Sequence, residues 1–433
     1  MTEPSHNPFA NLEVPVEEDY LHCIRCGTCL YNCPTYRESV RETDSPRGRI
    51  FLARKVLEGE AKLTPNLIEQ MYRCLACGAC NEICPVGNRP ADMALQLRWL
   101  AQQVEPAGWK QVVFHQLLAK PGLMELGTLP LRLYQLLGFR TVANALRLTS
   151  LLPRQLRDME RQLPKVPARP ARSRVPSITQ ATGQGAPKSR VGYFLGCAQN
   201  LLFYPGATAV VRVLARNQNQ VVTPESAQCC GMPAIGYGDW DALRAFARHN
   251  VQLFEKLDVD VIVTDCATCG STLKEYKHYL ASDPQWAERA NAFSSKVQDI
   301  SEYLASCDLV KPEGRVEGRV TYHDPCHLVR AQRVSAQPRK LLQLIDGLEF
   351  VEMNEANWCC GSAGSQIITH YETSMAVLDK KMANVAATEA DYIASGCPGC
   401  QMQLTVGVKR SGLRAKVVHP VQLLDWAYEQ HQR

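Results

Sequence analysis

The sequence predicts a multidomain α+β protein in which a small, largely α-helical N-terminal domain precedes two tandem α/β modules. Three observations support this prediction. One cysteine motif occurs twice within the first 100 of the 433 residues, and a longer cysteine pattern occurs twice in the C-terminal half. In that half, short β-branched runs alternate with helical patterns, which is typical of parallel sheets covered by helices.

Residues 1–100 contain a Cys-x2-Cys-x2-Cys-x3-Cys-Pro motif that begins at Cys23 and recurs from Cys74. This spacing is typical of two-cluster ferredoxins, in which the fourth cysteine of each motif binds the other cluster. The rule predicts two cubane 4Fe-4S clusters, one held by Cys23, Cys26, Cys29 and Cys84 and the other by Cys74, Cys77, Cys80 and Cys33. A single Cys-x2-Cys pair would also suit zinc, but the doubled motif with its prolines strongly favours iron and sulfide.

Two segments without a cysteine motif follow. Residues 101–152 are predicted to be a helical extension, with breaks at prolines such as Pro121 and Pro130. Residues 153–190 contain six prolines and nine Lys or Arg but only two acidic residues. Such a composition cannot form a core of its own, so we expect a mostly extended basic linker. Its charge suits either a soluble tether or contact with anionic lipid or an acidic partner.

The rest of the chain is an internal duplication, predicted as modules at 191–310 and 316–433. Cys197 and Cys326 lie 129 residues apart, and the later cysteines of the pattern keep an offset of 130 or 131. Each copy contains three candidate strands, at 190–196, 220–224 and 259–265 and at 319–324, 348–353 and 390–395. Helical patterns such as 240–257 and 373–388 lie between them. The cysteines follow the strand ends, where open α/β sheets place their sites.

Each module contributes five cysteines. They are Cys197, Cys229, Cys230, Cys266 and Cys269 in the first copy, and Cys326, Cys359, Cys360, Cys397 and Cys400 in the second. Five thiolates exceed the need of one zinc ion or one ordinary cubane cluster. Adjacent cysteines are hard to aim at one metal, although a larger or irregular cluster could use both. A zinc site with a spare thiol, a redox-active dithiol and a module without metal remain alternatives.

A few further residues lie close to these motifs. Arg47 and Arg49 follow the first motif, either as cations that stabilise a reduced cluster or as solvated arginines at a helix start. His323 and His327 flank Cys326 and are expected to be satisfied, partly buried histidines rather than ligands or proton relays. Cys307 lies outside every pattern and is expected to be a structural thiol.

No nucleotide- or flavin-binding fingerprint occurs in the sequence. The two-electron oxidation of an organic substrate needs such a cofactor, so we expect a flavin on another chain, unless a five-cysteine cluster does the chemistry itself. The sequence does not identify a catalytic residue. A net charge of +5 is too small to indicate nucleic acid. The N-terminus has no signal-peptide pattern, so we expect a cytoplasmic protein with reduced thiols, with peripheral contact on the inner face of the membrane as an option.

The order of the motifs resembles that of glycolate oxidase iron–sulfur subunits. The likeness extends to Ser45-Pro46-Arg47-Gly48-Arg49-Ile50 and to Cys359-Cys360-Gly361-Ser362-Ala363-Gly364. Lactate-utilisation proteins and heterodisulfide reductase subunits have similar Cys-Cys-Gly (CCG) modules. The resemblance implies an electron-transfer subunit that takes electrons from an FAD-linked oxidase subunit acting on glycolate or lactate and passes them to a quinone or other carrier. It also implies up to two noncubane 4Fe-4S clusters in the CCG modules.

Two other functions are compatible with the same motifs. One is a heterodisulfide-reductase-like catalytic subunit that reduces disulfides at noncubane clusters. The other is the iron–sulfur subunit of an anaerobic glycerol-3-phosphate dehydrogenase.

Overall fold

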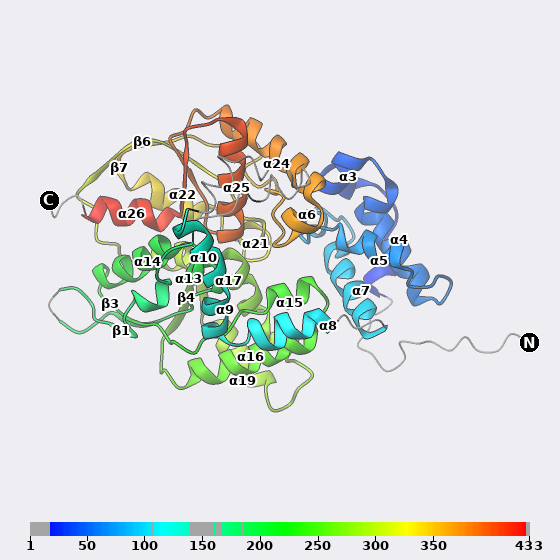
Figure 1. Ribbon diagram of the computed structural model, residues 1–433, viewed down its shortest axis with the longest axis horizontal. Helices are drawn as coiled ribbons and strands as arrows, with labels where there is room; N and C mark the ends of the chain where they lie inside the picture. Colours follow the sequence, from blue (N-terminus) through cyan, green and yellow to red (C-terminus); the bar gives the residue numbers. More distant parts are fainter. Residues whose placement is uncertain (1–17, 105–107, 139–159, 161–165, 184, 430–433) are drawn as a thin grey trace, which may run out of the picture.

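The structure is a computed structural model that describes residues 18–104, 108–138, 160, 166–183 and 185–429. The helical N-terminal domain lies at one side of the molecule, and the two α/β modules lie against each other at the other side (Figure 1). Helices α3 and α24 place the N-terminal domain against the second module.

Short helices form the N-terminal domain: α1 (Glu18–Leu21), α2 (Thr28–Tyr31), α3 (Pro34–Ser39), η1 (Glu42–Asp44), α4 (Pro46–Leu57), α5 (Pro65–Tyr72), α6 (Ala79–Glu82) and α7 (Pro90–Val104). Ser45 caps α4 by accepting a hydrogen bond from the Gly48 amide at 2.9 Å. Apolar residues of α4, α5 and α7, among them Ile50, Met71 and Leu97, form the core of this domain. The largely helical prediction is confirmed here.

The helical extension is confirmed where the structure describes it. Helices α8 (Gly108–Lys110), η2 (Gln111–Leu117, a π-helix), α9 (Pro121–Gly127) and α10 (Leu129–Leu136) follow one another. Pro121 and Pro130 lie in the first turn of α9 and α10, because a proline has no amide hydrogen to lose there. Residues 139–152 of this prediction lie outside the described residues.

The first module contains a five-stranded sheet in the order β1-β3-β2-β4-β5, parallel except at β1. Its strands are β1 (Ile178–Thr179), β2 (Ser189–Tyr193), β3 (Asn219–Val222), β4 (Val261–Thr264) and β5 (Val297–Asp299). The helices are α13 (Cys197–Leu201), α14 (Tyr204–Arg216), α15 (Met232–Gly236), α16 (Trp240–Glu255), α17 (Ala267–Lys274), α18 (Tyr276–Tyr279), α19 (Ala287–Ser295) and α20 (Ile300–Ser306).

The second module repeats this plan with a parallel four-stranded sheet in the order β7-β6-β8-β9. Its strands are β6 (Arg315–Tyr322), β7 (Asp346–Phe350), β8 (Tyr392–Ala394) and β9 (Lys416–Val418). The helices are α21 (Cys326–Val329), α22 (Ala336–Gln343), α23 (Gln366–Thr369), α24 (Tyr371–Ala386), α25 (Pro398–Ser411) and α26 (Pro420–Glu429). All six predicted strands are present, and the edge strands β1, β5 and β9 were not predicted.

The prediction of an extended linker over 153–190 is wrong for its second half. Residues 166–183 contain the short helix η4 (Ala171–Ser173) and strand β1, which pairs antiparallel with β3. Ala171 and Val175 are buried in the core of the first module. The segment needs no core of its own because the module supplies one. Residues 153–159 and 161–165 lie outside the described residues.

The two modules pack closely, and one hydrophobic core runs through both. It joins side chains of β2, such as Tyr193, to those of β6, such as Tyr322. The C-terminal helix α26 packs on α14 of the first module. There Arg212 Nε donates to Asp425 Oδ1 at 3.0 Å, and Asn217 donates to the Tyr428 hydroxyl at 3.3 Å. The two modules therefore pack together through a continuous interface.

Within the described residues, no helix has the length and apolar character required to cross a membrane.

Candidate iron–sulfur centres

Four cysteines from the two ends of the N-terminal domain line a small cavity at its surface. They are Cys23, Cys26, Cys29 and Cys84, and we name them the first cubane site. Cys26 is exposed to solvent, and the Thr28 hydroxyl at 3.2 Å from its sulfur lowers the pKa of this thiol. Arg47 also lines the cavity and binds Glu42 at 2.7 Å. The structure thus brings together the four cysteines that the motif rule grouped.

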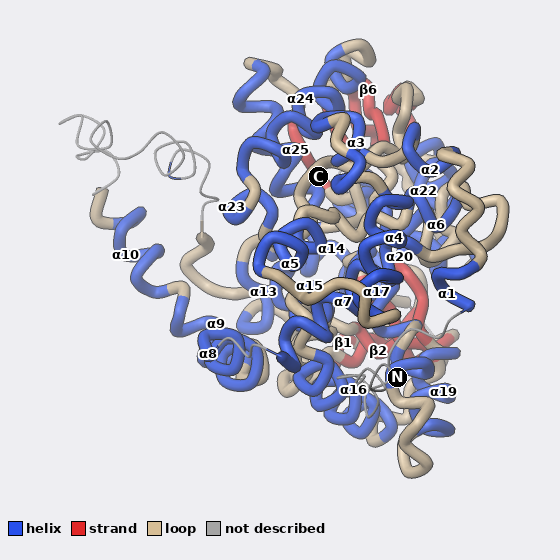
Figure 2. The backbone as a smooth tube through the Cα atoms, turned by 90° about the vertical axis from the view of Figure 1, so that its right-hand side faces the viewer, coloured by secondary structure: helices blue, strands red, loops and turns tan. Residues whose placement is uncertain are grey.

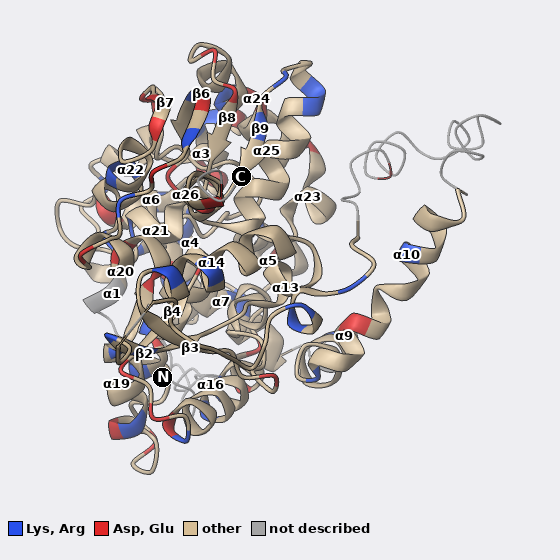
Figure 3. Ribbon diagram, turned by 90° about the vertical axis from the view of Figure 1, so that its left-hand side faces the viewer, with Lys and Arg blue, Asp and Glu red and all other residues tan. Residues whose placement is uncertain are grey.

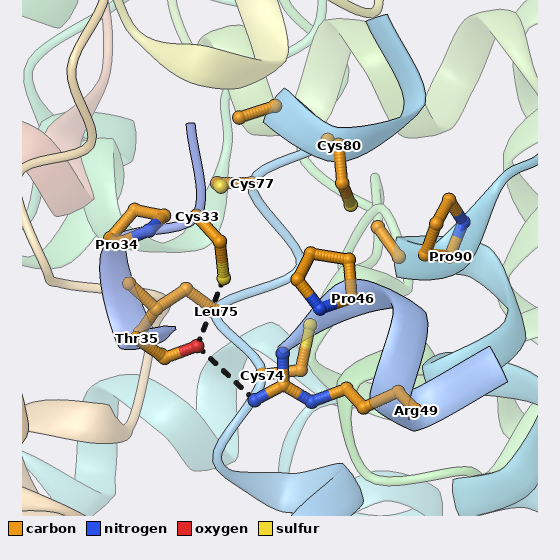
Figure 4. A pocket seen from close by; sticks show the side chains of 13 residues that line it. Cys33, Pro34, Thr35, Pro46, Arg49, Cys74, Leu75, Cys77, Cys80 and Pro90 are labelled. Carbon is orange, nitrogen blue, oxygen red and sulfur yellow. Dashed lines mark hydrogen bonds between the residues drawn. The ribbon is translucent and has the colours of Figure 1, made fainter. Parts of the chain in front are cut away.

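The other four cysteines of the N-terminal domain line a second, deeper cavity (Figure 4). They are Cys33, Cys74, Cys77 and Cys80, named the second cubane site. Arg49 points into the same cavity, is only 2% exposed, and donates to Thr35 Oγ1 at 3.2 Å. The Thr35 hydroxyl in turn lies 3.2 Å from Cys33 Sγ. Arg49 is therefore not a solvated arginine, because the pocket encloses its guanidinium.

Burial raises the pKa of the Cys33 and Cys80 thiols. Thiolates are the form that binds metal, so these thiols need a nearby positive charge, which Arg49 supplies and bound iron would add. A second arginine near this site, Arg98 of α7, donates to the carbonyl oxygen of Cys74 at 2.6 Å. Sequence reasoning missed Arg98, since only its position one turn after Ala94 on a buried helix face would have indicated it.

The second cubane site touches the second module. Cys77 packs with Leu75, Cys359 and Val377, and the adjacent Cys359 thiol raises the pKa of Cys77. Arg330 closes this contact, donating to the carbonyl oxygens of Cys77 at 3.4 Å and Asn357 at 2.9 Å. Arg330 was also missed, because its role depends on the packing of α21 against the N-terminal domain.

The ten module cysteines all line one cavity of about 600 Å³, which lies between the two modules and is also lined by residues of the N-terminal domain such as Tyr72 and Cys74. We name the five of each copy the first module site and the second module site. Cys197 and Cys266 follow β2 and β4, and Cys326 and Cys397 follow β6 and β8. These are the carboxyl ends of parallel strands, as expected from the sequence.

The adjacent cysteines of each Cys-Cys-Gly turn both face this cavity, contrary to the expectation that they would diverge. Gly231 and Gly361 have φ of 94° and 88°, a left-handed conformation that favours glycine. A Cβ at Gly361 would lie 2.6 Å from the Ser374 carbonyl oxygen. The turn is therefore tight enough to aim both thiols to one side.

The histidines beside Cys326 differ from each other. His327 is half-buried, lines the cavity, and its Nδ1 lies 3.6 Å from Cys326 Sγ. His323 is 1% exposed, and neither ring nitrogen has a hydrogen-bond partner among the described residues. The prediction of a satisfied histidine is therefore wrong for His323, whose ring faces sulfur instead of an ordinary polar group.

Cys307 lies apart from all four sites and packs against the shared core.

These donor sets fit iron–sulfur clusters. All nineteen cysteines are free of disulfides, and eighteen of them line three cavities, with four in each cubane site and the ten of the two modules in the third. Soft thiolates in fours are the ligand set of a cubane cluster. Ten thiolates around one cavity, five from each module, exceed what one zinc ion per module would need and suit larger clusters.

Comparison with known proteins agrees with this organisation. Family models match a 4Fe-4S dicluster domain at 19–88, a cysteine-rich domain at 191–274 and 320–405, and a glycolate oxidase iron–sulfur subunit linker region at 106–163. The chain is similar to the probable glycolate oxidase iron–sulfur subunit of Bacillus subtilis, with 37% identity over 94% of both chains. The glycolate oxidase iron–sulfur subunit of Escherichia coli is 29% identical over 94% of both chains. A fumarate reductase (CoM/CoB) subunit of Methanothermobacter marburgensis is 32% identical over 94% of this chain and 72% of that protein.

Proposed function

Because the chain belongs to the glycolate oxidase iron–sulfur subunit family, we propose that it transfers electrons within a flavin-dependent 2-hydroxy-acid oxidase. When bound, the clusters supply one-electron steps between the flavin of a partner subunit and a final acceptor. The residues of this chain hold the clusters, set their spacing and exclude water from the inner sites. Glycolate or lactate is the proposed substrate of the partner.

The contact between Cys77 and Cys359 is the observation that carries this proposal. It joins the N-terminal domain to the second module through the two sulfur-lined sites themselves. The first cubane site is open to solvent at Cys26, whereas Cys77 is half-buried and Cys359 is buried. We therefore assign electron entry to the first cubane site and onward transfer to the second cubane site and the second module site.

Replacing one cysteine at this contact tests the route. In the assembled complex, Cys77→Ser is expected to leave flavin reduction by the hydroxy acid unchanged. The rate of acceptor reduction should fall by more than about tenfold, because the second cubane site loses a ligand. Cys307→Ser, which lies outside all four sites, is the matched control. Wild-type acceptor reduction by Cys77→Ser at normal protein content would contradict the assignment.

The surface around the first cubane site is proposed to dock the FAD-linked subunit. Ile24 and Val86 at its mouth and Tyr31 on α2 are 66%, 36% and 72% exposed. Exposed apolar side chains gathered over a binding site are typical of protein interfaces. Docking here would bring the flavin near the one cluster site with an exposed cysteine.

Tyr31→Asp tests this surface, because Tyr31 does not line the cavity and its replacement should leave the cluster intact. The concentration of partner subunit needed for half-maximal rate is expected to rise about tenfold, a loss of about 1.4 kcal/mol in binding. Leu344→Asp, at a 36% exposed leucine of the second module, is the control. Equal partner binding by both variants and the wild type would rule out this docking surface.

A quinone is the proposed final acceptor, and contact with the inner face of the cytoplasmic membrane would give access to it. Helices α9 and α10 extend away from the body of the molecule (Figure 2). They carry exposed leucines, including Leu126 at 58%, Leu133 at 54% and Leu136 at 72%. The sequence that follows is rich in arginine and lysine. Leucines beside basic residues suit an interface with anionic lipid.

Thiol–disulfide reduction is a second candidate, and one observation favours it. The first and second module sites open to one shared cavity, which could admit a small disulfide between them. Incubating the reduced protein with a disulfide and without any other acceptor would test this function. Oxidation of the protein with stoichiometric thiol release would support it, and an unchanged spectrum would exclude it. The glycerol-3-phosphate alternative would instead require a partner that oxidises glycerol 3-phosphate.

A further inference from the structure

The two module sites differ at one equivalent position close to their cysteines. His323 lies three residues before Cys326, and Phe194 lies three residues before Cys197. Their amides donate to equivalent carbonyl oxygens, that of Ala394 for His323 at 2.9 Å and that of Val263 for Phe194 at 2.8 Å. Both side chains are fully buried. The duplicated fold therefore places an imidazole in one copy where the other copy has a phenyl ring.

The surroundings of the two rings also differ. Phe194 stacks on Phe254 with ring centroids 6.1 Å apart, as an ordinary core residue. A ring nitrogen of His323 and the sulfurs of Cys360 and Cys400 all lie within 4.8 Å of one another. No described residue lies in hydrogen-bond geometry at either ring nitrogen of His323, although the Cys360 thiol interacts with the ring. An imidazole carries at least one N–H in every tautomer and protonation state, and a buried N–H without an acceptor is costly.

We propose that His323 donates its N–H to a sulfur of the cluster held at the second module site, and thereby raises the reduction potential of this cluster above that at the first module site. The inference rests on the proposed function, since it requires both module sites to hold clusters. Hydrogen bonds to cluster sulfurs are among the factors that set such potentials, because they stabilise the added electron. The second module site thus becomes the favoured electron acceptor beyond the second cubane site.

A second difference between the copies acts in the same direction. Lys381 of α24 is fully buried beside the second Cys-Cys-Gly turn and donates to the carbonyl oxygens of Glu355 and Ala356 at 2.5 and 3.2 Å. At the equivalent position of α16, the neutral Asn250 donates to the carbonyl oxygen of Cys229 at 3.2 Å. At this equivalent position, a buried ammonium beside the second module site adds positive potential that the neutral Asn250 does not supply in the first copy.

An anaerobic redox titration of the full chain, followed by electron paramagnetic resonance, tests the inference. His323→Phe installs the residue that the first copy already accommodates. One cluster signal should shift to lower potential by at least a tenfold change in its reduction equilibrium, about 59 mV for one electron. His323→Gln keeps an N–H donor and is expected to recover most of the shift. A weak nitrogen coupling to that signal should be present in the wild type and absent in His323→Phe.

The iron content of each protein separates the outcomes. Unchanged potentials in His323→Phe at wild-type iron content would overturn the role of His323, as would a His323→Gln protein that retains iron but behaves like His323→Phe. If His323→Phe loses iron and His323→Gln retains both iron and potential, the N–H donor is supported. A wild-type protein with only about 8 iron atoms per chain would show that the module sites hold no clusters. That result would overturn both the inference and the proposed cluster loading without any variant.

Discussion

Single buried charged residues distinguish sites that the motifs make look alike. Arg49 is enclosed at the second cubane site, whereas Arg47 pairs with Glu42 at the solvent-exposed first cubane site. In the second module site, burial lowers the pKa of Lys381 to about 8. The packing around each set of cysteines determines which charged side chains lie beside it. The reduction potentials of the clusters should therefore differ between sites with similar cysteine spacing.

Asp299 gives a prediction at the scale of one residue. It is fully buried, accepts a hydrogen bond from the Ser301 amide at 2.8 Å, and has no partner at Oδ2 among the described residues. Burial raises its pKa from 3.8 to about 7. The folded protein therefore holds this proton more tightly than the unfolded chain, so the stabilisation is complete below about pH 4 and is lost as the pH rises through about 7.

Between pH 6 and pH 8 this loss should amount to roughly 1 kcal/mol. Asp299→Asn keeps an acceptor for Ser301 and does not titrate. Its melting temperature, measured without oxygen, is expected to rise relative to that of the wild type as the pH is raised from 6 to 8. Asp241→Asn, at an exposed aspartate of α16, serves as the control. Parallel pH profiles for wild type and Asp299→Asn would refute the assignment.

At the scale of elements, most helices and strands use their apolar faces to build the cores, but α9 and α10 do not. Figure 3 shows few charged residues on these two helices, which carry Glu125 and Arg132 among mostly uncharged side chains. Their exposed leucines therefore need a partner surface, which we propose to be anionic lipid.

Vesicle flotation provides the measurement for this element. The full chain is expected to float with vesicles rich in phosphatidylglycerol and much less with neutral phosphatidylcholine vesicles. The double variant Leu133→Asp with Leu136→Asp should lose most of this binding, since both side chains are more than half exposed on α10. Leu344→Asp should float like the wild type. Equal flotation of the double variant would exclude this face as the lipid contact.

At the scale of the whole molecule, the two modules share one core and one cavity, so their sites are expected to load together. About 16 iron atoms and 16 sulfides per chain are predicted for protein purified without oxygen, corresponding to four 4Fe-4S clusters. Cys230→Ser combined with Cys360→Ser, which removes one ligand from each module site, should lower both values to about 8. An unmodified chain with about 8 of each would show that only the cubane sites are loaded.

The sequence by itself determined the parts of this protein that depend on spacing along the chain. The motif spacing grouped Cys84 with the first cubane site and Cys33 with the second, and the cavities contain those groups. The constant offset between Cys197 and Cys326 identified the duplicated modules, and the β-branched runs located their central strands. Local patterns suffice for these features because the ligands and the strand periodicity are encoded within short segments.

Only the tertiary structure decided how the parts meet. The contact of Cys77 with Cys359, the packing of residues 166–183 on the first module and the shared core of the two modules all join residues distant in sequence. The same holds for His323, whose partners Cys360 and Cys400 come from other loops of its module. Burial and charge at such contacts depend on the packing of whole elements, so no local pattern could reveal them.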